Sequence, residues 1–313
     1  MVGTAVTREQ LDDAVDYDDV EGHHDDAKWV DVRGQRMHVI DVGPERDARG
    51  TLVMVHGNPT HGFYFRRLIA HFRKHYRCIV PDHIGMGRSS KPDDSEYSFT
   101  LGQRIADLDN VIEALCPQGP LNLILHDWGG MIGMGYAVRH RARIARLALM
   151  NTAAFALPNG KSLPWSLRLS RTPLLGALAV RGLNLFCRGA LSECLGTAQL
   201  SSAEKAGYLA PYDSWANRIA VHRFVQDIPL HSRDASYACV AHVERELGKF
   251  IDCPTQIYWG AKDFVFDDDF LAQWQSRLPQ AVVHRFASAG HYVLEDAHAQ
   301  IIPLLESFLE SKA

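Results

Sequence analysis

The chain has 313 residues, of which 46% are hydrophobic, and its formal net charge is −4. This is enough apolar material for a sizeable buried core, and the nearly balanced charge gives no reason to expect a nucleic-acid partner, which selects a basic surface. Residues 1–15 lack the basic and apolar regions of a secretory signal, and no run approaches the roughly 18 apolar residues of a transmembrane segment.

Six cysteines are spread through the chain without a CxxC pair. Several lie in apolar segments, so we expect reduced, buried thiols in a cytoplasmic protein rather than a disulfide framework. The sequence has no phosphate-binding loop, and His23 and His24 beside Asp25 and Asp26 fit a solvated tail better than a metal site. We therefore expect neither a metal nor an organic cofactor.

Residues 1–27 are acidic and poor in large apolar side chains, which predicts a loosely attached arm. From residue 28 onward, apolar strands alternate with segments of helical periodicity. The predicted strands are two short ones around Arg33-Gly34, then 51–57, 77–82, 121–130 (ending in a sharp turn), 144–153, 255–260 and 281–288. The predicted helices are 63–75, 101–115, 131–141, 268–278 and 297–309. This alternation predicts an α/β protein with a mostly parallel eight-stranded sheet covered by helices on both faces.

The alternation is interrupted at 157–230, where prolines and helix-like runs occur without a clear strand. We interpret this segment as a helical cap inserted into a core formed by 28–156 and 231–313. Its apolar residues either line a substrate tunnel or form the cap's own core, and the sequence leaves both interpretations open. These residues are Leu174, Leu175, Leu178, Val180, Leu183, Leu185 and Phe186.

The segment LHDWGG at 125–130 lies where a buried strand turns abruptly into a helix. In the α/β-hydrolase fold this turn is the nucleophile elbow, usually G-x-S-x-G, which exposes one side chain at the carboxyl edge of the sheet. Here Asp127 occupies the nucleophile position and Leu125 replaces the first glycine. Asp127 alone would serve equally well as a helix N-cap. The motifs that follow favour the nucleophile.

Three more motifs supply the groups that such a nucleophile needs. HGNP, which contains Asn58, lies at the turn after a strand. In this fold that turn gives one backbone N–H to the oxyanion hole, and the residue after the nucleophile, here Trp128, gives the other. His291 in GHYVLED follows the last strand, and Asp263 in WGAKDF follows an earlier one. The chain order matches the catalytic triad of this fold, which predicts Asp127 as nucleophile, His291 as base and Asp263 as the acid that orients it.

A carboxylate nucleophile suits displacement at saturated carbon, because the ester formed on it can be hydrolysed. We expect Asp127 to become esterified and His291 to activate the water that attacks this ester. The side-chain N–H groups of Asn58 and Trp128 are donors that would stabilise a departing anion such as a halide or a carboxylate. The plain alternative for Trp128 is packing in the core.

Together, HGNPT, HDWGG, WGAKDF and GHYVLED resemble the haloalkane dehalogenases of the α/β-hydrolase fold, and the resemblance covers nearly the whole chain after about residue 28. The site residues that this resemblance implies are nucleophile Asp127, base His291 and anion-binding Asn58 and Trp128. Some branches of the family carry the triad acid after the sixth strand. Here that strand ends in Asn151-Thr152, so Asp263 takes the role.

Further stretches, mainly in the cap, resemble the branch that contains the β-lactone decarboxylases of bacterial long-chain olefin biosynthesis; they include NTAAFALP, GYLAPYDSWANRIA and RFVQDIPL. This resemblance implies a hydrophobic small-molecule substrate, a cis-3,4-dialkyl-oxetan-2-one, which is converted to a cis-alkene and carbon dioxide. The site of attack, ring carbon or carbonyl, stays open. The resemblance also allows an assembly with other olefin-biosynthesis enzymes and, through them, association with a membrane.

Three alternatives remain. A haloalkane dehalogenase would use the same residues and release halide and alcohol. An epoxide hydrolase is suggested by Tyr208 and Tyr212, which resemble the paired tyrosines of that family, although Pro211 interrupts the helical face between them. A catalytically silent ligand receptor on the same fold is the non-enzyme alternative, and such a protein would not need a complete triad.

Overall fold

The computed structural model describes residues 27–311, so the predicted acidic arm lies outside the described residues except for Ala27. Within 27–311, eight strands form one sheet in the order β1-β2-β4-β3-β5-β6-β7-β8. Two pairings, β1 with β2 and β2 with β4, are antiparallel, and the others are parallel. The strands are β1 (Ala27–Val32), β2 (Gln35–Val42), β3 (Thr51–Val55), β4 (Arg77–Pro81), β5 (Leu121–Asp127), β6 (Ile144–Thr152), β7 (Thr255–Gly260) and β8 (Val282–Phe286). The predicted α/β class and mostly parallel eight-stranded sheet are confirmed.

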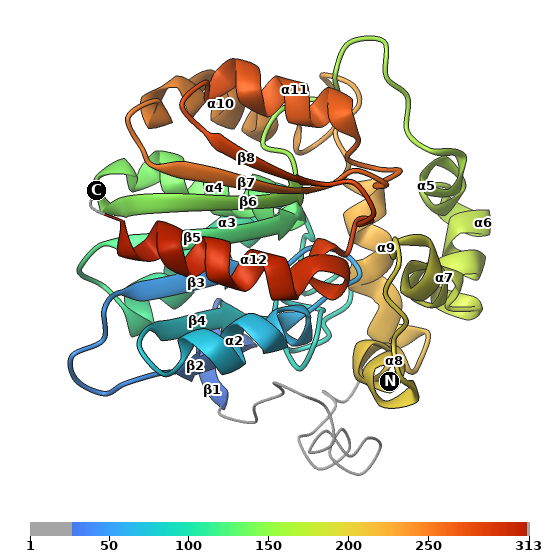
Figure 1. The fold of residues 1–313 in the computed structure, drawn as a ribbon. Coiled ribbons are helices and arrows are strands. Elements are labelled where there is room, and N and C mark those ends of the chain that lie inside the picture. The colour runs from blue at the N-terminus through green and yellow to red at the C-terminus, as the bar shows by residue number, and fades with distance from the viewer. Residues whose placement is uncertain (1–26, 312–313) are drawn as a thin grey trace.

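The helices of the core cover both faces of the sheet, with α2 and α12 on one face (Figure 1). On the other face lie α3, α4, α10 and α11. Side chains of β3 alternate between these two layers: Val53 and Val55 belong to the second core, and Leu52 and Met54 to the first. Because successive strand residues point to opposite faces, a continuously apolar strand is what a sheet covered on both sides requires. The core helices are α2 (Arg66–Phe72), α3 (Leu101–Leu115), α4 (Trp128–Arg139), α10 (Tyr237–Glu246), α11 (Asp268–Arg277) and α12 (Val293–Glu310).

Three predicted helices differ from the structure at their N-terminal ends. The strand predicted over 121–130 ends at Asp127, so α4 begins at Trp128 rather than at residue 131. The segment predicted as a helix from residue 63 begins with a 3-10 turn, η1 (Gly62–Phe65), before α2. The last helix begins at Val293, four residues earlier than predicted, with Glu295 and Asp296 in its first turn. Acidic side chains there suit the positive end of the helix dipole.

Between β6 and the core helix α10, five α-helices, a π-helical turn and two 3-10 turns lie beyond the carboxyl ends of the strands (Figure 1). The α-helices and the π-helical turn are α5 (Trp165–Ser170), α6 (Pro173–Ala177), η3 (Leu178–Gly182), α7 (Leu185–Glu193), α8 (Ser202–Leu209) and α9 (Ile219–Gln226). All of them fall inside the segment predicted as a cap, although the division of the chain at 157 and 230 stays a prediction.

The apolar residues of the cap segment do not share one environment. Val180 is buried, and Leu185 and Phe186 line the large cavity described below. Four leucines are exposed and do not line that cavity, so both interpretations of the sequence, tunnel and cap core, are wrong for them. They are Leu174, Leu175, Leu178 and Leu183. Helical periodicity identifies an apolar face but does not say what covers it.

Candidate active site

Asp127 stands at the junction of β5 and α4 with φ 52° and ψ −125°, in the positive-φ region that a non-glycine residue seldom adopts. Its side chain makes no N-cap hydrogen bond, and the α4 backbone N–H that acts on it is that of the adjacent Trp128, so it is not a conventional N-cap. The helix starts close to the sheet: a Cβ atom on Gly129 would lie 1.9 Å from the carbonyl oxygen of Val55, and one on Gly130 would lie 1.8 Å from Oγ1 of Thr152. The glycines after the turn therefore permit the geometry of a nucleophile elbow.

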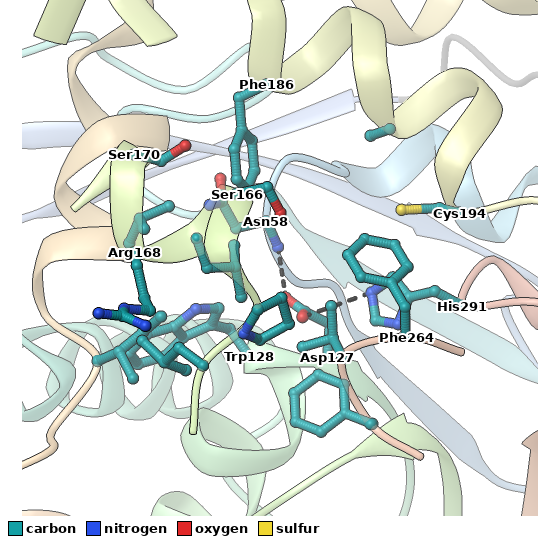
Figure 2. Close-up of a pocket in the computed structure, with 18 of the residues that line it drawn as sticks. Asn58, Asp127, Trp128, Ser166, Arg168, Ser170, Phe186, Cys194, Phe264 and His291 are labelled. Carbon is teal, nitrogen blue, oxygen red and sulfur yellow. Dashed lines mark hydrogen bonds and ion pairs between the residues drawn. The ribbon is translucent and has the colours of Figure 1, made fainter. Parts of the chain in front are cut away.

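Asp127 is 7% exposed, and its carboxylate has defined partners on both oxygens. Oδ1 accepts a hydrogen bond from the backbone N–H of Asn58 at 2.7 Å, and Oδ2 lies 3.5 Å from Nε2 of His291 (Figure 2). Burial acts to raise the pKa of Asp127, but the hydrogen bond and charge of His291, with the backbone N–H of Trp128, outweigh it and leave this pKa below its ordinary value. The carboxylate is therefore ionised at neutral pH.

His291 lies in the loop between β8 and α12, 3% exposed, with its ring stacked at 5.7 Å on that of Phe266. Its Nδ1 lies 2.7 Å from Oδ2 of Asp263. Burial acts to lower the pKa of His291, whereas the charge of Asp263 and the hydrogen bonds of Asp127 and Asp263 raise it to about 10. The resting site thus holds an imidazolium between two carboxylates.

Asp263, in the loop after β7, is fixed from several directions. Its Oδ1 accepts the backbone N–H groups of Val265 at 2.7 Å and Phe266 at 3.0 Å. Its Oδ2 accepts from Nδ2 of Asn151 at 3.0 Å. In the sequence, Asn151 marks only a place where a carboxylate is missing. Its position at the end of β6, beside β7, is the signal from which this contact could have been inferred.

The side chains of Asn58 and Trp128 lie beside Asp127 (Figure 2). Nδ2 of Asn58 donates to the carbonyl oxygen of Val221 at 3.1 Å, which uses one of its two N–H groups. The indole of Trp128 packs 5.2 Å from the ring of Phe224, and its N–H donates to no residue that the structure describes. Both side chains line the cavity, so each has an N–H group available to a ligand.

Above these residues lies a cavity of about 960 Å³ between the core and the cap. Asn58, Asp127, Trp128 and His291 form its base, so the structure brings four of the five predicted site residues to one cavity, and Asp263 contacts it through His291. The walls are mainly apolar and include Phe155, Leu163, Leu167, Phe186, Val225 and Phe266. Such a lining selects an apolar ligand, with the few polar groups fixing its orientation.

One cavity residue and two tyrosines differ from what the sequence suggested. Cys194 lines the cavity, and no motif in the sequence marked it. The hydroxyl of Tyr208 donates to the carboxylate of Glu295, and that of Tyr212 donates to the carbonyl oxygen of Thr60 at 3.4 Å. Neither tyrosine lines the cavity. The pair is therefore not arranged as epoxide hydrolysis would require.

Comparison with known proteins agrees with this geometry. The family model for the alpha/beta hydrolase fold matches residues 50–298. The chain is 46% identical to the cis-3-alkyl-4-alkyloxetan-2-one decarboxylase of Shewanella oneidensis, over 90% of this chain and 87% of that protein. It is 44% identical to the enzyme of the same name from Xanthomonas campestris pv. campestris, over 92% of this chain and 97% of that protein.

Among solved structures, the haloalkane dehalogenase DbeA from Bradyrhizobium elkani superimposes with a TM-score of 0.81 at 23% identity, covering 90% of this chain and 97% of that one. At this identity the likeness concerns the fold alone. The family model spans the cap segment and every predicted site residue, and the two decarboxylases match 90% and 92% of this chain. The chain therefore belongs to the α/β-hydrolase fold family and, within it, to the family of the cis-3-alkyl-4-alkyloxetan-2-one decarboxylases.

Proposed function

We propose that this protein converts cis-3-alkyl-4-alkyloxetan-2-ones to cis-alkenes and carbon dioxide, with Asp127 as nucleophile. The observation that carries the proposal is an ionised, buried carboxylate at the base of an apolar cavity, in a chain 46% identical to a decarboxylase of this name. A carboxylate with little water around it is a stronger nucleophile than one in solution. The apolar walls suit the two alkyl chains of such a lactone.

The reaction balances without water. Asp127 attacks C4 of the lactone from the side opposite the ring oxygen, the C4–O bond breaks, and its electron pair remains on the new substrate carboxylate. The N–H groups of Asn58 and Trp128 stabilise this anion. The bond between C3 and the carboxylate carbon then breaks, its electrons form the C3–C4 double bond, and the C4–O bond to Asp127 breaks to return the free carboxylate. Carbon dioxide leaves.

This sequence of steps also accounts for the geometry of the product. Inversion at C4 followed by anti elimination gives a net syn loss of carbon dioxide, so a cis-lactone yields a cis-alkene. His291 moves no proton in this scheme. Because its pKa is raised to about 10, it remains an imidazolium that stabilises Asp127 as the group leaving C4. Asp263 holds the imidazolium in place.

A protein with this activity acts in olefin biosynthesis, next to the enzymes that form the β-lactone ring, and the scattered, reduced cysteines suit a cytoplasmic location. Haloalkane dehalogenation is the alternative chemistry, because an alkyl ester on Asp127 that meets water would be hydrolysed. Only the fold likeness and more distant relatives favour it.

The test is to supply purified protein with a cis-3,4-dialkyl-oxetan-2-one and, separately, with 1-bromobutane. Alkene is measured by gas chromatography and bromide by an ion assay. Asp127→Asn keeps the shape of the nucleophile and removes its charge. The matched control is Asp252→Asn, which changes an exposed carboxylate that is paired with Arg141. We expect alkene from the unmutated protein and the control, and a loss of about 10³-fold or more in Asp127→Asn.

Bromide without alkene would replace the proposal with a dehalogenase, and the absence of both products would leave a silent receptor. A turnover in H₂¹⁸O separates the two chemistries at Asp127 itself. Decarboxylation as written leaves the Asp127 carboxylate unlabelled, whereas hydrolysis of an ester on Asp127 places ¹⁸O in it. Mass spectrometry of the peptide that contains Asp127 reads the result.

A further inference from the structure

A set of large apolar side chains lies exposed on the cap, on α5, α6 and η3, at the start of α7, and at Trp215 between α8 and α9. Leu174 is 85% exposed, Trp165 77% and Leu175 63%. We define the cap face as Trp165, Leu169, Leu174, Leu175, Leu178, Leu183, Leu185 and Trp215. Scattered single apolar residues are normal on a protein surface, but a group of this size marks a binding surface.

Close packing makes the cap face continuous. A Cβ atom on Gly176 of α6 would lie 2.3 Å from the carbonyl oxygen of Ser170, which shows how closely α6 approaches α5. A Cβ atom on Gly182 would lie 3.1 Å from Leu178 and 3.6 Å from Trp215. In Figure 1 these helices form the outer side of the molecule, away from the sheet. Their exposed side chains therefore belong to one surface.

The charge of this segment differs from that of the chain. Between residues 157 and 193 there are five basic side chains (Lys161, Arg168, Arg171, Arg181, Arg188) and one acidic side chain (Glu193), whereas the net charge of the whole chain is −4. Lys161 and Arg171 are paired with aspartates outside this segment, which leaves Arg168, Arg181 and Arg188 to face the surface. Arg168 and Arg188 are exposed and form no ion pair with any residue in the described range 27–311. Arg181 lies 4.6 Å from the centre of the Trp215 ring. Leucine, tryptophan and arginine together are the composition of a helix that binds an anionic lipid surface.

The cap face also reaches the cavity. Trp165, Leu169 and Leu185 are exposed members of the face, and all three line the cavity that contains Asp127. Arg168, which is exposed, lies among the cavity residues as well (Figure 2). An apolar molecule held at this face would therefore enter the cavity without first crossing bulk water.

The helices suit a position along a bilayer rather than through it. In residues 27–311 no single helix is long and apolar enough to cross a membrane, although the pair Pro173–Gly182 and Leu185–Glu193 meets that composition together, with a bend of 71° between its halves. Core helices of globular proteins have similar composition, but they bury their leucines, whereas Leu174, Leu175 and Leu178 are exposed.

We propose that the cap face binds the surface of an anionic lipid bilayer, with its leucines among the acyl chains and its arginines at the phosphates. The binding itself does not depend on the reaction. Its consequence, that the substrate passes from the lipid through Trp165, Leu169 and Leu185 to Asp127, rests on the proposed function. A lactone with two long alkyl chains is concentrated in membranes, so this route would bring the cavity to its substrate.

The test is flotation of the full chain with vesicles of equal parts phosphatidylcholine and phosphatidylglycerol, and with vesicles of phosphatidylcholine alone. The Leu174→Glu/Leu178→Glu variant adds two charges to the cap face at residues that do not line the cavity. Its matched control, Ile251→Glu/Val282→Glu, changes two exposed aliphatic residues at the opposite, amino ends of β7 and β8. We expect the unmutated chain and the control to bind the anionic vesicles. The amount of the cap variant that binds should be lower by about tenfold or more. Added salt weakens the binding.

Absence of flotation by the unmutated chain, or equal flotation by the cap variant, would overturn the proposal. So would a dimer that forms with rising concentration and is dissociated by the cap variant without any vesicle binding, because the face would then be covered by a second copy. Turnover of a short-chain, water-soluble β-lactone without vesicles should be equal in all three proteins. Flotation that follows the cap face while no protein turns over the lactone would support this proposal and overturn the proposed function.

Discussion

The side-chain amide of Asn151 donates to Oδ2 of Asp263 at 3.0 Å, and the same oxygen lies 2.7 Å from Nδ1 of His291. Asn151 also holds the backbone of Gly260 from both sides, donating to its carbonyl oxygen at 3.0 Å and accepting from its N–H at 2.7 Å. The ends of the neighbouring strands β6 and β7 therefore fix one carboxylate against the imidazole. Asn151 acts as a positioning residue for Asp263.

We predict that the acid can be moved between these two strands. Asp263→Asn should lower kcat by about 10²- to 10³-fold, since an amide no longer stabilises the imidazolium. Adding Asn151→Asp to that variant places a carboxylate on β6, next to the same imidazole. The double variant should have a kcat about tenfold higher, or more, than that of Asp263→Asn alone. Alkene formation measures both. Asn151→Asp alone should lower kcat, because it sets a second negative charge against Asp263. A double variant no more active than Asp263→Asn would contradict the prediction.

A second prediction concerns the titration of His291. Its pKa is raised from 6.5 to about 10 by Asp263 and Asp127 against the opposing effect of burial. Asp127→Asn removes one of these charges, so the pKa of His291 should fall. A group whose pKa is raised on folding stabilises the protein fully below its unfolded pKa, and loses that contribution as the pH rises through its folded pKa.

The unfolding free energy of the unmutated protein should therefore decrease more steeply than that of Asp127→Asn between pH 6.5 and about 10. Urea unfolding at several pH values measures this difference, and NMR of the imidazole Cε1–H measures the pKa directly. An unchanged His291 pKa in Asp127→Asn would show that the charge of Asp127 does not contribute to the raised pKa of His291.

The sequence predicted those parts of the molecule that depend on local signals. An apolar strand and the LHDWGG turn are each recognised from a few consecutive residues. These signals predicted the sheet and the position of Asp127 correctly. The triad order could be read because each of its members follows a strand, and the carboxyl ends of parallel strands meet at one edge. Asp263 and His291 accordingly lie in contact.

Features that depend on distant contacts were not predictable in the same way. Asn151 is an amide at a position where a carboxylate was sought, and its role appears only when β7 lies beside it. Leu174 and Leu178 have the composition of a buried face, yet nothing in the described chain covers them. Cys194 follows α7 in a segment without a motif, and only the placement of the cap over the core brings it to the cavity.

A third prediction tests the packing beneath the elbow. Gly129→Ala would place a methyl group 1.9 Å from the carbonyl oxygen of Val55, a backbone atom that cannot move without disturbing β3. We expect a loss of about 3 kcal/mol or more in the unfolding free energy. Gly102→Ala, in the first turn of α3, meets no atom within 4 Å and should stabilise the protein by up to about 1 kcal/mol. Urea unfolding compares the two, and equal effects would show that the elbow is not tightly packed.

A fourth prediction concerns a buried ion cluster that connects the core with the cap. Arg66 of α2 donates to both oxygens of Glu295 in α12, at 2.6 Å and 2.9 Å, and to Glu204 of α8 at 2.7 Å. Tyr208 of α8 also donates to Glu295. The side chains of Arg66 and Glu295 are each 1% exposed. Burial acts to lower the pKa of Arg66, but Tyr208 and Glu295 outweigh it and raise this pKa, so the guanidinium stays charged.

Glu295→Gln keeps the size of the side chain and removes its charge, which leaves a buried guanidinium with only Glu204 as its carboxylate partner in the cluster. Breaking one side of a buried pair costs about 3–5 kcal/mol, because the remaining charge cannot be hydrated. Asp268→Asn, which breaks the exposed pair with Arg285, should cost less than about 1 kcal/mol. Because the cluster ties α8 to α2 and α12, proteolysis within the cap should also accelerate in Glu295→Gln and not in Asp268→Asn. Equal destabilisation in urea would mean that solvent reaches Arg66, and that packing rather than this cluster holds the cap above the cavity.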